Sequence, residues 1–156
     1  MDPNFNLYSL AESWNLRQIT GFYRGTLRTL SYEFENAILQ GNIQGRLFAG
    51  FQKMSYFLTR LDRYSQLAQV VGQIWIFGIP DVDLPQSIEG ITFVPLREHD
   101  RLVKEWFLVI DSPVFFSALV ANELTTFDVP NSERQFQGIW SFDDVLVSYL
   151  HTGSLR

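Results

Sequence analysis

Hydrophobic residues in the first half of the chain recur at helical spacing. Over residues 23–40 they fall at steps of three and four, which predicts an amphipathic helix that ends at Gly41-Asn42. Similar steps continue over residues 43–71 in a broader apolar stripe, so a second and longer helix is expected there, ending at Gly72. This half of the chain is therefore predicted to be mainly helical.

Runs of β-branched and aromatic residues predict strands in the second half. They cover residues 73–77, 91–96 and 106–110, and a fourth run with alternating polar residues covers 135–142. The run over 106–110 has no alternation, which is typical of a central strand covered on both faces. Residues 105–113 as a whole therefore predict a buried strand that leads directly into a helix.

The start of that helix is predicted from two residues. Ser112 suits an N-cap and Pro113 suits the first turn, so residues 114–124 are expected to be helical. Short helices are also expected over residues 7–15 and after Asp143. Together the elements predict a single α/β domain, in which an N-terminal helical portion packs on a sheet of about four strands whose order stays unresolved.

Composition and charge argue against several classes of function. The 156 residues are 46% hydrophobic and 15% aromatic, which suffices for one core. With 12 basic against 17 acidic residues, the net charge of -5 does not favour binding to the phosphates of nucleic acids. Without cysteine there are no disulfides, thiolate metal sites or thioether-linked chromophores. No apolar run approaches the roughly 20 residues that span a bilayer, so a cytoplasmic protein without membrane partners is expected.

Three acidic residues directly follow predicted strands: Asp81, Asp111 and Asp143. In an open α/β sheet with parallel strands, ligands bind beyond the carboxyl ends of the strands, so these residues are candidate ligand contacts that are expected to lie together. The structural alternative is stronger. Asp111 and Asp143 would cap the helices that follow them, and Asp81 lies in a Pro-Asp turn, where its side chain can bond the backbone.

Two further sets of side chains are candidates for contact with a small ligand. Arg17, Arg24 and Arg28 share the neighbourhood of the first long helix, where a solvated face is the favoured explanation and a specific anion site is the alternative. Trp106 and Trp140 fall in predicted strands, where core packing is favoured and a pocket for a flat aromatic ligand is the alternative.

Enzyme chemistry has little support in the sequence. A phosphoryl-accepting receiver domain needs a lysine beside its acidic residues, but Lys53 falls within the predicted long helix and Lys104 at the start of its strand. No phosphate-binding glycine loop, Gly-x-Ser-x-Gly elbow or His-Glu-x-x-His helix is present. His99 and His151 are expected at the surface. No catalytic residue, metal ligand or cofactor is assigned.

The predicted long helix over residues 43–71 has two interpretations. Its wide apolar stripe favours packing within the domain. The alternative is a dimerisation or signal-transmitting helix, for which Phe51 and Leu58 are the candidate interaction residues. A charge placed at either position would then give a folded monomer instead of an unfolded chain.

Three segments resemble a known family. They are Ile-Phe-Gly-Ile-Pro-Asp at residues 76–81, Glu-Trp-Phe-Leu-Val-Ile-Asp-Ser-Pro at 105–113, and Phe-Gln-Gly-Ile-Trp-Ser-Phe-Asp at 136–143. Together they resemble the DICT domain, a sensory module named for diguanylate cyclases and two-component systems. The last segment is similar to that family's closing Gly-Ile-Trp-Thr-Phe-Asp pattern, with Ser141 in place of threonine.

This resemblance implies a function that residue chemistry alone does not. It implies residues 1–22 as an N-terminal helical extension and 23–156 as a non-catalytic sensory domain of prokaryotic signalling, associated with histidine kinases, cyclic-di-GMP enzymes or transcriptional outputs, and with light responses. The partner, such as a histidine kinase or diguanylate cyclase, would act in cis in a longer protein or in trans, and a homodimer is also considered. The alternative is an interaction module that binds no small ligand. The resemblance carries over no catalytic residue, and it leaves any ligand or cofactor unidentified.

Overall fold

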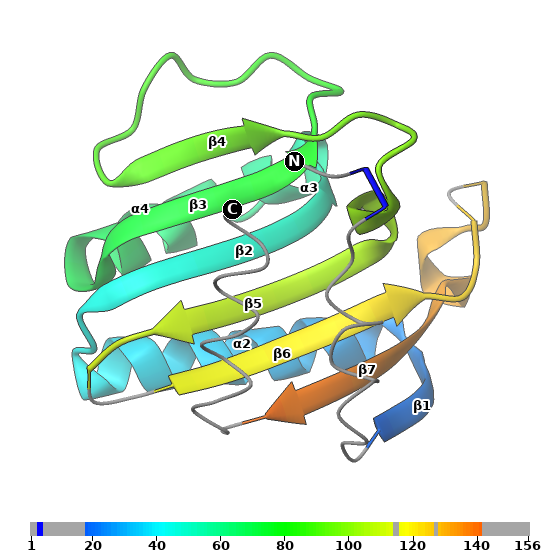
Figure 1. Ribbon diagram of the computed structural model, residues 1–156, viewed down its shortest axis with the longest axis horizontal. Coiled ribbons are helices and arrows are strands. Elements are labelled where there is room, and N and C mark those ends of the chain that lie inside the picture. Colours follow the sequence, from blue (N-terminus) through cyan, green and yellow to red (C-terminus); the bar gives the residue numbers. More distant parts are fainter. Residues whose placement is uncertain (1–2, 5–17, 114–115, 127, 142–156) are drawn as a thin grey trace.

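One mixed β-sheet with helices packed against it organises the described part of the chain (Figure 1). The structure is a computed structural model that describes residues 3–4, 18–113, 116–126 and 128–141. Its elements are β1 (Gln18–Tyr23), α2 (Arg24–Gly41), β2 (Gly45–Lys53), α3 (Met54–Leu58), α4 (Leu61–Val71), β3 (Gly72–Ile79), β4 (Ile91–Pro95), the 3-10 helix η1 (Arg101–Lys104), β5 (Glu105–Asp111), β6 (Phe116–Glu123), the 3-10 helix η2 (Asn131–Glu133) and β7 (Gln135–Ser141).

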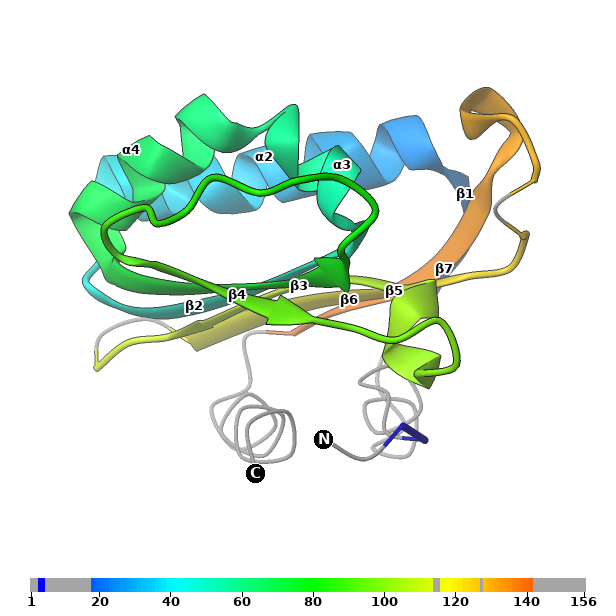
Figure 2. The same cartoon turned by 90° about the horizontal axis from the view of Figure 1, so that it is seen from above.

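The seven described strands lie in the order β1-β7-β6-β5-β2-β3-β4. The strands β2, β3 and β4 run parallel, and every other neighbouring pair is antiparallel. All three described α-helices lie on one face of the sheet, and the edge formed by β1 and β7 bends towards them (Figure 2). The single α/β domain with helices packed on a sheet is therefore confirmed, with a larger sheet than the expected four strands.

The long helix expected over residues 43–71 is wrong in its first third, which is the strand β2, whereas the two helices α3 and α4 occupy most of the remainder. Phe48 lies against the second core cluster, on the opposite side of β2 from Leu47 and Phe51, so both faces of this strand are buried. A spacing of four residues, as between Leu47 and Phe51, fits one face of a strand as well as one face of a helix. Gly50 fits here because a Cβ atom at this position would overlap the ring of Phe107 on β5.

The helix expected over residues 114–124 is also wrong, because Phe116–Glu123 form strand β6 between β5 and β7. Ser112 and Pro113 therefore belong to a connection between antiparallel strands instead of a helix start. Other elements are confirmed: α2, β3, β4, β5 and β7 lie where the pattern predicts them, and Gly72 ends α4 with a φ of 100°. Strand β1 lies between the helices predicted over residues 7–15 and 23–40, where no element is predicted, and both terminal helices fall outside the described residues.

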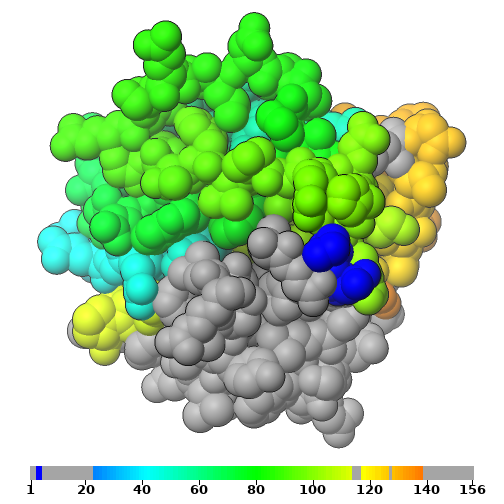
Figure 3. Space-filling model, turned by 45° about the horizontal axis from the view of Figure 1, so that its top comes forward, coloured from blue at the N-terminus to red at the C-terminus, as the bar shows by residue number. Residues whose placement is uncertain are grey.

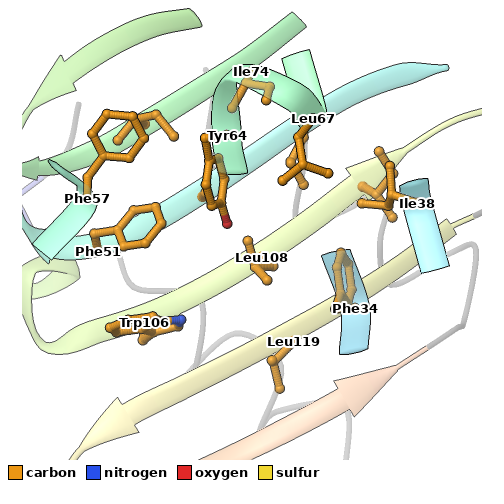
Figure 4. Close-up of a cluster of buried hydrophobic side chains, with 14 of the residues drawn as sticks. Phe34, Ile38, Phe51, Phe57, Tyr64, Leu67, Ile74, Trp106, Leu108 and Leu119 are labelled. Atoms are coloured by element: carbon orange, nitrogen blue, oxygen red, sulfur yellow. The ribbon is translucent and has the colours of Figure 1, made fainter. Parts of the chain in front are cut away.

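The main hydrophobic core lies between the helices and the sheet. Helices α2 and α4 contribute side chains such as Phe34 and Tyr64, which face Phe51, Trp106 and others on the strands (Figure 4). A second cluster lies on the opposite face of the sheet and is made by Phe48, Phe77, Leu96, Leu102, Val103, Phe107, Val109, Ala118 and Val120. Burial on both faces explains why the central strands have continuous apolar sequences.

Segments outside the regular elements lie beside η1 and between β3 and β4. Pro3 and Asn4 lie beside η1, where the carbonyl of Pro3 accepts a hydrogen bond from the backbone N–H of Arg101 at 2.7 Å (Figure 3). The connection between β3 and β4 runs over the surface without a helix. Among the described segments, no helix has both the length and the hydropathy required to cross a bilayer.

Candidate functional site

A cavity lined by arginine and aromatic side chains is the strongest candidate site in the described residues. Its volume is about 280 Å³, close to the lower bound of small-molecule pockets. It lies where the start of α2, the segment following α3, the start of β5 and η2 come together. We call it the arginine cavity; it is lined by Arg24, Arg28, Tyr56, Thr59, Arg60, Trp106 and Asn131.

Arg24 is the first residue of α2 and forms one wall of the cavity. Its guanidinium carbon lies 5.1 Å from the ring centre of Tyr56 and 5.8 Å from that of Trp106. The Nε atom of Arg24 is buried without a hydrogen-bond partner in the described structure. Burial and the nearby positive charge of Arg134 lower the pKa of Arg24 below its ordinary value. The arginine is thus held beside aromatic rings with an unused donor.

Arg60, between α3 and α4, forms a second wall and belongs to a buried polar network. One of its nitrogens, Nη2, donates a hydrogen bond to Glu35 of α2, a carboxylate that is fully buried. Glu35 also accepts hydrogen bonds from Arg63 at 3.0 Å and from the hydroxyl of Tyr64 at 2.5 Å. The other nitrogen of Arg60, Nη1, is buried and has no partner in the described structure. Glu35 therefore fixes Arg60 while leaving one of its N–H groups unused.

The pKa of Tyr64 reflects the burial of this network. Burial, followed by the negative charge of Glu35, raises the pKa of the Tyr64 hydroxyl well above its ordinary value. The hydroxyl therefore stays protonated and continues to donate to Glu35.

Arg134 forms a second buried network behind the cavity and is itself 0% exposed. Its Nε and Nη2 atoms donate to the two carboxylate oxygens of Glu123 at 2.7 and 2.6 Å. Nη2 also donates to Gln52 at 2.6 Å, and Nη1 donates to the Tyr56 hydroxyl at 2.9 Å and to Asn131 at 3.3 Å. Arg134 thereby positions Tyr56 and Asn131, two residues that line the cavity.

The hydrogen bonds of this network also lower the pKa of Glu123. Burial alone would raise the pKa of Glu123, but hydrogen bonds from Arg134, Thr125 and Gln52 outweigh burial and lower it below the ordinary value. Gln52 reaches the network from a bulge in β2, where it has a φ of 69°. A residue other than glycine at positive φ is strained, so the network contacts have to stabilise this conformation.

The directions of the strands place two of the candidate ligand contacts, Asp81 and Asp111, far apart. Because β5 runs antiparallel to β2 and β3, Asp81 after β3 and Asp111 at the end of β5 lie at opposite ends of the sheet (Figure 1). Asp81 accepts hydrogen bonds from the backbone N–H of Ser55 at 2.9 Å and from its hydroxyl at 2.6 Å, at the start of α3. Asp111 forms an ion pair with Arg46 at 2.6 Å. The expectation that these residues lie together is wrong.

The other candidates have different positions. Trp106 is 4% exposed, donates its Nε1–H to the hydroxyl of Ser31 at 3.0 Å and lines the arginine cavity. Trp140 belongs to β7, and Asp143 lies outside the described residues. Phe51 is buried on β2, and Leu58 ends α3 half-buried against the core, so the continuous helix assumed for an interaction surface does not exist.

Several cavity residues escaped the sequence-based assignment. The sequence places Arg24 and Arg28 near each other, but it favours a solvated face as their explanation. Arg60 falls within the predicted long helix, and Arg134, which positions two of the lining residues, lies just before the predicted strand over residues 135–142. The periodic pattern contains no signal for either, because their roles depend on contacts with Glu35 and Glu123 from distant elements.

Other parts of the described structure are weaker candidates. A hollow of about 500 Å³ near η1 and the end of β6 has mixed charge, and its buried carboxylate, Asp100, already lies 3.5 Å from the guanidinium of Arg97. Among the described residues, no three histidine, aspartate or glutamate side chains gather to hold a metal ion. The arginine cavity differs from this hollow because its lining residues have two buried donors without a partner in the described structure, whereas the hollow has one buried acceptor without a hydrogen bond, Asp100 Oδ1.

Comparison with protein families gave one match. The family model described as "Sensory domain in DIguanylate Cyclases and Two-component system", abbreviated DICT, matches residues 5–124. Comparisons with curated proteins and with solved structures gave no match. The matched range covers more than half of the chain and contains Arg24, Arg60 and Trp106, whereas Asn131 and Arg134 follow it.

Proposed function

Because the chain belongs to the DICT family of sensory domains, we propose that it is a non-catalytic input domain that binds a small molecule in the arginine cavity. The observation that carries this proposal is the pair of buried donors, Arg24 Nε and Arg60 Nη1, that have no partner in the described structure. Burying a donor without a partner costs about 1–3 kcal/mol. A ligand that accepts these hydrogen bonds would recover this free energy.

The place of the cavity suits a sensory role. Arg24 and Arg60 belong to the helical layer, whereas Trp106 belongs to the sheet and Asn131 to η2, just before β7. A ligand that binds all of them would favour one arrangement of the helices over the sheet. For a signal to result, the ligand has to bind that arrangement more tightly than the alternative.

The output of the domain is a further part of the proposal. The family description names diguanylate cyclases and two-component systems. We propose a cytoplasmic signalling partner of this kind, such as a histidine kinase or a diguanylate cyclase, in cis or in trans. A contribution to light responses would require a chromophore held without a thioether bond, because the chain has no cysteine.

Native mass spectrometry of the protein purified from cells tests the proposal. A discrete added mass that is lost on denaturation is the expected result. In a Thr59→Trp variant, the larger side chain should fill the cavity and remove the added mass without changing the charge. A bare chain at every stoichiometry would contradict the proposal and favour a ligand-free interaction module instead. An added mass that persists in Thr59→Trp would place the ligand elsewhere.

A further inference from the structure

The residues that line the arginine cavity carry mainly hydrogen-bond donors. Arg24 Nε and Arg60 Nη1 have no partner in the described structure. The Tyr56 hydroxyl accepts a hydrogen bond from Arg134, which leaves its own proton to donate. Asn131 uses its carbonyl oxygen to accept from Arg134, which leaves its amide N–H groups. Such a set complements a group that only accepts hydrogen bonds.

Charge leads to the same conclusion. Arg24, Arg28 and Arg60 line the cavity, and the exposed Arg28 adds its charge near the protein surface. The carboxylates that bond to this region, Glu35 and Glu123, are already shared with Arg63 and Arg134. This local excess of positive charge contrasts with the net charge of -5 for the whole chain. Positive charge in excess of its counter-ions, held beside apolar rings, is unfavourable, so an anion is the favoured occupant.

The size and the lining of the cavity restrict which class of anion can bind. A volume of about 280 Å³ suits a small molecule, and the rings of Tyr56 and Trp106 provide apolar surface beside the guanidinium groups. Guanidinium groups bind carboxylate and phosphate oxygens with well-matched geometry. We infer that the arginine cavity binds the oxyanion of a small organic acid, a carboxylate or a phosphate monoester, through Arg24 and Arg60. This inference rests on the proposed sensory function and adds the chemical class of its ligand.

The inference is tested with the full chain and three probes: benzoate, phenyl phosphate and the neutral benzamide. Binding is followed by calorimetry in a buffer without phosphate, and by the NMR signal of the Trp106 indole N–H. Benzoate or phenyl phosphate should bind at least about tenfold more tightly than benzamide, because only an anion forms charge-assisted hydrogen bonds. The tighter of the two anions then distinguishes a carboxylate from a phosphate ligand.

Arg24→Gln is the diagnostic variant, because removing Arg24 leaves the Glu35 and Glu123 networks intact. It should weaken binding of the preferred anion roughly tenfold to a hundredfold, and Arg24→Lys should restore part of the affinity. Arg97→Gln makes the same charge change at a side chain that is 61% exposed and absent from the cavity lining. This control should leave the affinity unchanged.

Two results would overturn the inference. Equal affinity for benzoate, phenyl phosphate and benzamide would exclude an anion site, as would equal losses in Arg24→Gln and Arg97→Gln. The proposed sensory function would survive either result if native mass spectrometry still found an added mass that Thr59→Trp removes. If none of the three probes binds and the chain is bare, both proposals fail.

Discussion

Arg24 and Arg134 lie near the same tyrosine ring, yet replacing them should change stability by very different amounts. Their guanidinium carbons are 5.1 and 5.4 Å from the ring centre of Tyr56. Arg134 holds Glu123 with two short hydrogen bonds and is fully buried. Arg134→Met would leave Glu123 as a buried carboxylate without its cation, which should lower the free energy of unfolding by about 3–5 kcal/mol.

Arg24→Met should change stability far less. The variant loses cation–π contacts with Tyr56 and Trp106, each worth about 0.5–1 kcal/mol, but it also removes a buried donor without a partner and the repulsion from Arg134. The net change is expected to stay within about 1 kcal/mol.

Urea unfolding, followed by circular dichroism and tryptophan fluorescence, measures both changes. The double variant Arg134→Met/Glu123→Leu provides the control, because replacing both members of a buried ion pair with apolar residues is often nearly neutral. It should recover most of the stability that Arg134→Met loses. The reasoning would be refuted if Arg24→Met were as destabilising as Arg134→Met, or if the double variant were no more stable than Arg134→Met.

Three further predictions concern the networks and the sheet. Because the pKa of Glu123 lies below its ordinary value of 4.5, its contribution to stability is complete above that pH and is lost as the pH falls through the lower folded value. Acid unfolding of Glu123→Gln should therefore show a shallower pH dependence below 4.5 than the unsubstituted protein, and an identical slope would contradict this assignment. Gly50→Ala should lower stability by about 1–3 kcal/mol, as measured by thermal unfolding, because the added methyl overlaps Phe107; Phe107→Leu in the same chain should restore part of it. Asp81→Ala should lower the free energy of unfolding in urea by about 0.5–2 kcal/mol, because Ser55 loses two hydrogen bonds at the start of α3; no change would mean that water replaces them.

The sequence predicts those elements whose patterns have one structural solution. Helix α2 has one buried stripe, with Leu27, Phe34 and Ile38 facing the sheet, so its period identifies it. Strands β2 and β6 are buried on both faces, and a buried apolar run fits a strand or a helix equally well. Whether such a run forms a strand or a helix depends on the segments that pair with it. β6 is a strand because it pairs with β5, the strand directly before it, and with β7, which follows it after a longer connection.

The site could be predicted only in part, for a related reason. Arg24 and Arg28 are one turn apart on α2, so their proximity is visible in the sequence, and an anion site was already an alternative explanation. Arg60 joins them only because β2 and α3 bring it back over α2, where Glu35 holds it. Asp81 and Asp111 were assigned to one end of the sheet on the assumption of parallel strands, and the antiparallel pairing of β5 removes that assumption.

Unfavourable local features lie in and beside the arginine cavity. Gln52 has a positive φ, and two buried guanidinium donors have no partner in the described structure, although the surrounding cores are well packed. Proteins tend to retain such departures where function requires them. Glu35 and Glu123 compensate part of the charge but lie on opposite sides, one in the helical layer and one in the sheet. An anion bound between Arg24 and Arg60 would supply the missing acceptors between these two layers, so the same contacts that recognise the ligand would also couple the helices to the sheet.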